Sequence, residues 1–190
     1  MKKIRIIPLL LLATGLILLA SGCSDDDEQD AWDKYKTNRE LNNAWLERLQ
    51  TRTNADGTPY YKMIVPSWNP GAYVLIHYFN DRAETEGNLK PLSTSTVDVR
   101  YEGYLYDGTL FDSSTSNTTY GPGIFRTKLT GANVISGWTM AVTDMRVLDT
   151  AEVIIPYESA YGASLSSSNI PPYSNLRFNI RLQDIVYYEK

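Results

Sequence analysis

The chain has 190 residues, a formal net charge of −4, one cysteine and one histidine. This length suits one folded domain with an appendage and is sufficient to bury a core. The acidic balance, without any cluster of Lys and Arg, argues against a nucleic-acid partner. A lone cysteine cannot form an internal disulfide, and the scarcity of Cys and His argues against a structural zinc site.

The first residues have the pattern of an export signal. Basic residues at the very start precede an almost wholly apolar stretch, residues 6–20, which is short for a membrane span. Small residues then lead to Cys23, as at the cleavage site of a bacterial lipoprotein, although Ala20 stands where leucine is more usual. We expect residues 1–22 to be a lipoprotein signal peptide and Cys23 to be lipidated. The alternatives are an ordinary signal peptide and a retained anchor helix.

An acidic run, residues 24–28, follows Cys23. Such a run is typical of a solvated tether, so residues 23–31 are interpreted as the lipidated cysteine and its acidic tether. The run also resembles the export signal that sends Bacteroidetes lipoproteins to the outer face of the outer membrane. We therefore expect a protein of the cell envelope, lipid-anchored to the outer membrane and displayed at the surface. An anchor that faces the periplasm is the alternative.

A helical pattern begins at residue 32 and continues to residue 50. Its apolar residues recur near a 3.6-residue period, and the Asn54-Ala55-Asp56-Gly57 sequence ends it. Residues 32–57 therefore form a helical N-terminal extension. The favoured interpretation is a helix that packs back on the domain, and the alternative is an arm for dimerisation or for binding clients.

The remainder of the chain, residues 58–190, has the period of two that indicates strands. A hairpin is predicted at Asp107-Gly108, and a short helix over residues 138–145. Residues 81–95 and 113–120 are polar and are predicted to be loops. The predicted strands are residues 60–65, 72–79, 96–106, 109–111, 123–129, 150–155 and 175–188. This order predicts an α+β fold, in which a curled antiparallel β-sheet, or half-barrel, wraps on one short α-helix.

Several short motifs occur in a fixed order along this part of the chain. They are Tyr101-Glu102-Gly103, residues 107–114, Val134-Ile135-Ser136-Gly137-Trp138, Ala160-Tyr161-Gly162 and Ile170-Pro171-Pro172. In this order and spacing they resemble the pocket of the FKBP-type peptidyl-prolyl cis-trans isomerases, here in a lipoprotein form of the Bacteroidetes kind. The resemblance covers residues 72–189 and implies an FKBP-like fold for residues 58–190.

The resemblance also implies which residues form the site. Trp138 is the floor on which a proline ring sits, and Tyr101, Phe125 and Phe178 are its walls. Phe111 and Ile170 contact the rim and the residue before proline. Val134 and Ile135 line the edge, where the Ile135 N–H donates to a substrate carbonyl. The Tyr161 hydroxyl contacts the substrate backbone, and Asp112 orients the carbonyl end of the pocket with the Tyr101 hydroxyl.

The implied reaction is isomerisation of X-Pro bonds during folding of exported or surface proteins, without metal, cofactor or covalent nucleophile. Proline-containing polypeptides are the implied substrates, and macrolides are possible ligands. Ser136 and the Ser/Asn-rich segment 165–169 depart from the family pattern. They keep open an alternative, a catalytically weak chaperone or binding module of the same fold for proline-containing segments. A surface polysaccharide-binding lipoprotein would explain the anchor and the many tyrosines but not the ordered motifs.

Overall fold

The computed structural model describes residues 31–130, 133–164 and 169–187. The signal peptide, the lipidated Cys23 and almost all of the tether lie outside the described residues, as do residues 165–168 of the loop near the pocket. Within the described part of the chain, no helix combines the length and the hydrophobicity that crossing a bilayer would need.

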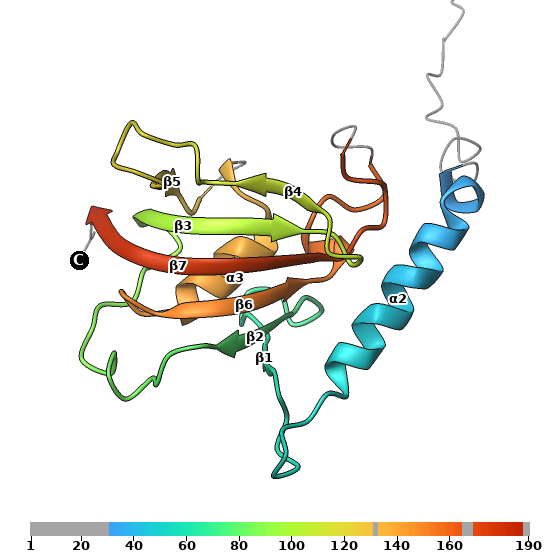
Figure 1. Cartoon of the computed structure of the whole chain (residues 1–190), viewed down its shortest axis with the longest axis horizontal. Coiled ribbons are helices and arrows are strands. Elements are labelled where there is room, and N and C mark those ends of the chain that lie inside the picture. Colours follow the sequence, from blue (N-terminus) through green and yellow to red (C-terminus); the bar gives the residue numbers. More distant parts are fainter. Residues whose placement is uncertain (1–30, 131–132, 165–168, 188–190) are drawn as a thin grey trace, which may run out of the picture.

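Seven strands form one antiparallel sheet (Figure 1). They are β1 (Lys62–Ile64), β2 (Val74–Tyr78), β3 (Thr96–Tyr104), β4 (Leu110–Ser113), β5 (Phe125–Lys128), β6 (Thr150–Ile155) and β7 (Leu176–Tyr187). The order across the sheet is β1-β2-β6-β7-β3-β4, and β5 also pairs with β3. This architecture confirms the predicted α+β class and the curled sheet.

One edge of β3 is shared by two strands. Its first half, from Thr96 to Val99, pairs with β5, and its second half, from Glu102 to Tyr104, pairs with β4. The chain leaves the sheet between β4 and β5 and returns after residue 124. The predicted hairpin after β3 is confirmed, because Leu105 N–H donates to the Thr109 carbonyl at 2.9 Å.

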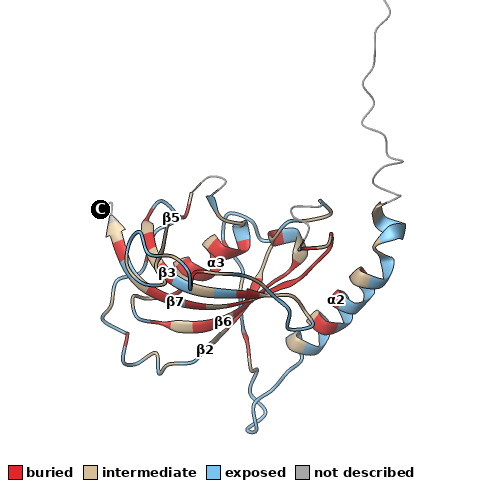
Figure 2. Ribbon diagram, turned by 45° about the horizontal axis from the view of Figure 1, so that its top comes forward, coloured by how far each residue is buried: buried red, intermediate tan, exposed pale blue. Residues whose placement is uncertain are grey.

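A short helix, α3 (Ser136–Asp144), covers one face of the sheet (Figures 1 and 2). The alternation along β3 directs Val97 and Val99 into the core between sheet and helix, where both are fully buried. Gly137 allows the helix to lie close to the sheet, since a methyl group at this position would overlap the Ile155 side chain. This packing fixes the start of α3, which carries residues of the candidate site.

The N-terminal helix, α2 (Lys36–Gln50), flanks one end of the sheet and packs on the domain (Figure 2). Trp45 buries its ring in a second apolar cluster with Tyr61, Leu75 and Ile154. Asn42 is fully buried, and its Oδ1 accepts a hydrogen bond from the Asn175 N–H at 2.8 Å. The favoured interpretation of this helix, packing back on the domain, is therefore confirmed.

The polar segment before β3 forms turns, as predicted, and a buried carboxylate attaches it to the domain. The Asp149 side chain accepts from the Thr85 hydroxyl at 2.6 Å and from the Asn80 amide at 3.1 Å. It also pairs with Arg82, with 3.3 Å between Nε and Oδ2. A 3-10 turn, η2 (Tyr157–Ser159), was not predicted; it follows β6 and leads to Tyr161.

Candidate functional site

A cavity of about 100 Å³ opens between the start of α3 and strands β3, β4, β5 and β7. That volume is roughly three times the share of one water molecule in the liquid, enough for a small ring. Its lining comprises all but one of the residues that the sequence predicted, together with Asn133: Tyr101, Phe111, Asp112, Phe125, Asn133, Val134, Ile135, Trp138, Tyr161 and Phe178.

Aromatic rings make up most of the wall of this cavity. Trp138 is 3 % exposed and lies at the centre of the group. Its ring meets those of Tyr101, Phe178 and Phe125 edge to face, with centroid distances of 5.2, 5.7 and 6.4 Å. Phe111 meets Phe178 in the same way at 5.6 Å. Rings packed at these distances and angles support one another, so the cavity is held open by side chains with little freedom to move.

Gly103 on β3 makes room for two of these rings. A Cβ atom at this position would lie 2.8 Å from Phe111 Cζ and 2.8 Å from Phe178 Cε1, which is closer than carbon atoms approach one another. Glycine is required at this position because the two rings occupy the space that a side chain would fill.

Two polar side chains stand at one end of the cavity. The Tyr101 hydroxyl donates to Asp112 Oδ2 at 2.7 Å, which is the pairing that the sequence predicted. Burial, and then the hydrogen bond and charge of Asp112, raise the pKa of the Tyr101 hydroxyl well above its usual value of about 10. The phenol therefore remains a neutral donor throughout the physiological range of pH.

The segment before α3 presents backbone groups to the cavity. Among the described residues, none accepts a hydrogen bond from the Ile135 N–H. The hydroxyl of Ser136 donates to the Ser159 carbonyl at 3.1 Å and fixes the start of the helix against η2. Asn133 also lines the cavity.

Tyr161 and Ile170 lie differently with respect to the cavity. Tyr161 lines it and is 40 % exposed; burial and the Asp112 charge raise the pKa of its hydroxyl, which has no hydrogen-bond partner among the described residues. Ile170 does not line the cavity. It is 5 % exposed and packs in the core cluster that also contains Trp138 and Phe178. Its contact with the rim stays a prediction.

Among the described residues that line the cavity, none is basic and only Asp112 carries a carboxylate. In the part of the chain that the structure describes, no group of three or more His, Cys, Asp or Glu residues is placed to hold a metal ion. The arrangement offers a ring-sized apolar surface, one N–H donor and two hydroxyl groups. Such a site can grip a small apolar ring and hydrogen-bond the amides beside it.

The sequence of residues 87–183 matches the family described as FKBP-type peptidyl-prolyl cis-trans isomerase. The chain belongs to this family. The matched residues include every strand from β3 to β6, the whole of α3 and most of β7, so they contain the entire cavity.

Individual FKBP relatives agree with this assignment. A macrophage infectivity potentiator of Trypanosoma cruzi is 38 % identical, over 56 % of this chain and 52 % of that protein. The FKBP-type 22 kDa isomerase of Escherichia coli is 41 % identical, over 50 % of this chain and 44 % of that protein. The aligned part is thus about half the length of these relatives.

A solved isomerase from Pseudomonas syringae has a TM-score of 0.60 and 24 % identity, over 80 % of this chain and 95 % of that one. This likeness shows the fold.

Proposed function

We propose that this protein is a peptidyl-prolyl cis-trans isomerase that uses the cavity above Trp138. The observation that carries the proposal is the set of aromatic rings packed edge to face around Trp138, beside an unused N–H donor at Ile135. A proline ring is small, apolar and flanked by amides, which are the properties that this cavity complements. Membership of the FKBP family supports the same reaction.

The chemistry follows from the nature of the X-Pro amide. Its partial double bond opposes rotation with a barrier of ~18–20 kcal/mol, and uncatalysed isomerisation takes on the order of tens to hundreds of seconds. At the twisted transition state the amide resonance is lost, and charge separation across the bond falls. An apolar cavity that excludes water therefore favours the twisted state over the planar one. Each ~1.4 kcal/mol of this preference increases the rate tenfold, and no proton transfer is required.

The polar groups orient the substrate in this scheme. The Ile135 N–H donates to a substrate carbonyl, and the exposed Tyr161 hydroxyl contacts the substrate backbone. The Asp112–Tyr101 pair stands beside the reacting amide, where the hydrogen bond holds both side chains in place. Asp112 thus positions the Tyr101 ring as a wall of the cavity. Macrolides that present a ring and a carbonyl in the same arrangement would compete for the cavity.

We further propose that the isomerase is a lipoprotein of the outer membrane that assists folding of exported or surface proteins. The signal-like residues 1–22, Cys23 and the acidic run after it support this location. Several acyl chains on one cysteine anchor a protein stably, whereas one chain binds only marginally. Labelling of cells with radioactive palmitate tests the anchor: the wild-type protein should take up label, and Cys23→Ser should not.

The isomerase activity is tested with a short peptide that carries an apolar residue before proline. The protein begun at residue 24 should accelerate cis-to-trans conversion, and Trp138→Ala should lose at least tenfold of that acceleration. The matched control is Trp68→Ala, because the Trp68 ring is 62 % exposed and lies outside the cavity. Tyr161→Phe should reduce the rate less than Trp138→Ala does. Folded protein that accelerates no peptide, whichever residue precedes proline, would refute the enzyme and favour a binding module.

A further inference from the structure

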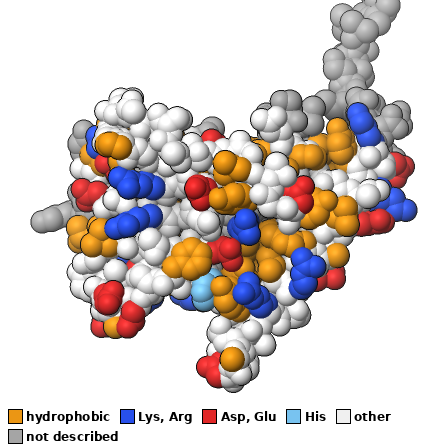
Figure 3. Space-filling model, viewed as in Figure 1, with side chains coloured by type: hydrophobic (Ala, Val, Ile, Leu, Met, Phe, Trp, Pro, Cys, Tyr) orange, Lys and Arg blue, Asp and Glu red, His pale blue; other side chains and the backbone are white. Residues whose placement is uncertain are grey.

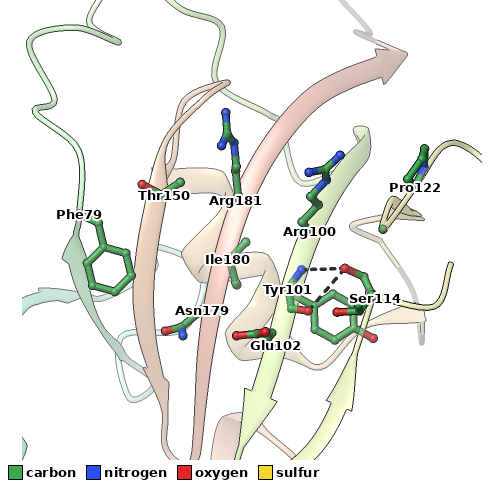
Figure 4. A pocket seen from close by; sticks show the side chains of 12 residues that line it. Phe79, Arg100, Tyr101, Glu102, Ser114, Pro122, Thr150, Asn179, Ile180 and Arg181 are labelled. Atoms are coloured by element: carbon green, nitrogen blue, oxygen red, sulfur yellow. Dashed lines mark hydrogen bonds between the residues drawn. The ribbon is translucent and has the colours of Figure 1, made fainter.

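A second and larger groove, of about 510 Å³, lies on the face of the sheet opposite to α3 (Figure 4). Strands β3, β6 and β7 form its floor. Phe79, just after β2, stands at one end, and the chain between β4 and β5 forms the other wall with Ser114 and Pro122. We call it the outer groove. Tyr101 belongs to both sites, since its ring lines the proline cavity and the strand that carries it runs under the outer groove.

Two arginines on neighbouring strands face each other in the outer groove. Arg100 on β3 is in register with Arg181 on β7, and both residues are exposed (Figure 4). Figure 3 shows that basic side chains lie next to one another on this face of the molecule. Like charges directly opposite on neighbouring strands destabilise a sheet. Neither guanidinium has an ion pair or hydrogen bond with another described residue. By contrast, Arg177 on the same strand stacks over the Tyr104 ring at 4.6 Å.

The floor of the groove also holds an acceptor without a donor. The Oδ1 atom of Asn179 is buried and has no hydrogen-bond partner among the described residues, although the residue lies only two positions from Arg181 on β7. Leaving a buried polar atom unpaired costs free energy, and because this atom is covered, a ligand N–H group would recover that cost by displacing the neighbouring atoms that cover it. Phe79 adds an apolar surface at the end of the groove, where its ring is 55 % exposed.

These features together select the chemistry of the occupant. Two guanidinium groups suit a carboxylate, and the Asn179 acceptor suits a backbone N–H. Glu102 is in register with Asn179 and would repel a polymer that is anionic along its whole length, such as a uronate chain or a nucleic acid. An extended polypeptide meets all of these requirements, because it carries N–H donors throughout and carboxylates only at intervals.

We propose that the outer groove is a second polypeptide-binding site. It takes an extended segment with an acidic side chain against Arg100 and Arg181 and an apolar side chain against Phe79. Because the two sites lie on opposite faces of the same strands, the segment binds without entering the proline cavity. A client that carries such a segment would be held by the protein independently of its prolines.

Fluorescence anisotropy with a defined, labelled peptide tests this proposal. The probe is a proline-free ten-residue peptide of Ser and Thr that carries two Glu and one Leu, so the proline cavity is not a competing site. We expect it to bind the wild-type protein, and the same peptide with Gln in place of Glu to bind at least tenfold more weakly. Affinity should fall as salt is raised, since the arginines are exposed to solvent.

Protein variants identify the groove as the binding site. Arg100→Gln with Arg181→Gln should lose at least tenfold in affinity for the Glu peptide. The control, Arg48→Gln with Lys128→Gln, removes the same charge from exposed positions outside the groove and should stay within twofold of wild type. Asn179→Leu should also lower the affinity for the Gln peptide, because it removes the acceptor oxygen.

Equal binding by the arginine pair variant and its control would overturn the proposal, as would equal binding of the Glu and Gln peptides. Binding of polygalacturonate without any binding of the Glu peptide would overturn it in favour of a glycan. Isomerisation of a short proline peptide should be unchanged by the arginine pair variant, so failure here is distinguishable from failure of the proposed activity.

Discussion

Adding one methyl group to β3 should damage both the stability and the activity of the protein. In Gly103→Ala the new Cβ would lie 2.8 Å from the Phe111 ring and 2.8 Å from the Phe178 ring. The Phe178 ring packs edge to face against both Phe111 and Trp138, so it cannot withdraw without disturbing the packing around Trp138. Overpacking of this kind costs about 1–3 kcal/mol, and we expect a loss in that range in the free energy of unfolding.

The same displacement narrows the cavity, so the isomerisation rate should fall roughly tenfold, which corresponds to ~1.4 kcal/mol of transition-state stabilisation. Stability is measured by urea unfolding, and activity with the short proline peptide. The matched control is Gly87→Ala, because a Cβ at residue 87 would meet no atom within 4 Å. The control should change the free energy of unfolding by no more than about 0.5 kcal/mol.

A second substitution separates crowding from other effects of the methyl group. Phe111→Leu added to Gly103→Ala removes one of the two close contacts, so it should recover part of the lost stability. It should not recover the rate, since Phe111 is itself a wall of the cavity. If Gly103→Ala behaved like Gly87→Ala in both assays, the two rings would not occupy the space that the structure gives them, and the account of the cavity would be refuted.

Three further results are expected. Between about pH 6 and 9 the isomerisation rate should not change through ionisation of Tyr101, because burial and Asp112 raise the pKa of its hydroxyl well above ~10. A step in the pH–rate profile that Tyr101→Phe removes would contradict this. Burial tends to raise the pKa of Asp144, but hydrogen bonds from Tyr78 and Lys62 and nearby positive charges lower it overall. The contribution of Asp144 to stability is therefore present above about pH 4 and is lost as the pH falls through the lowered pKa. Asp144→Asn should therefore destabilise the protein to urea by about 1–3 kcal/mol at pH 7 and by much less at pH 2.5; an equal loss at both pH values would count against it. Asn42→Ala should cost about 1–3 kcal/mol, since it leaves the Asn175 N–H buried without an acceptor, whereas exposed Asn43→Ala should cost little in the same unfolding assay.

The features that are local in sequence could be predicted from it. The alternation of Val97, Val99 and Tyr101 gives β3 its inward face, and Asp107-Gly108 closes the hairpin, with Gly108 at a φ of +91°. The boundaries of most strands agree with the prediction within a few residues. The motifs of the proline cavity were recognisable because they recur in family order, although their roles in catalysis stay predictions until the variants are measured.

Features that depend on distant residues could not be predicted. An Asn on an amphipathic helix is expected to face solvent, and no residue near Asn42 in the sequence indicates its contact with Asn175, which is 133 positions away. The resemblance to the family implied that Ile170 contacts the rim, but the sequence did not indicate that its side chain would be buried in the core. The outer groove depends on the register between β3 and β7, which sets Arg100 beside Arg181 and which no local pattern encodes.

The contact between Asn42 and Asn175 limits how the isomerase domain can be rearranged. Asn175 also accepts from the Tyr157 N–H at 2.8 Å through its Oδ1, so one side chain joins α2 to the turn that leads to Tyr161. A gene fusion that began at residue 58 would expose the apolar patch under Trp45 and remove the hydrogen bonds between Asn42 and Asn175. The helix should therefore be kept with the domain in any chimaera, and the smallest transferable unit is longer than residues 87–183, which match the family in sequence.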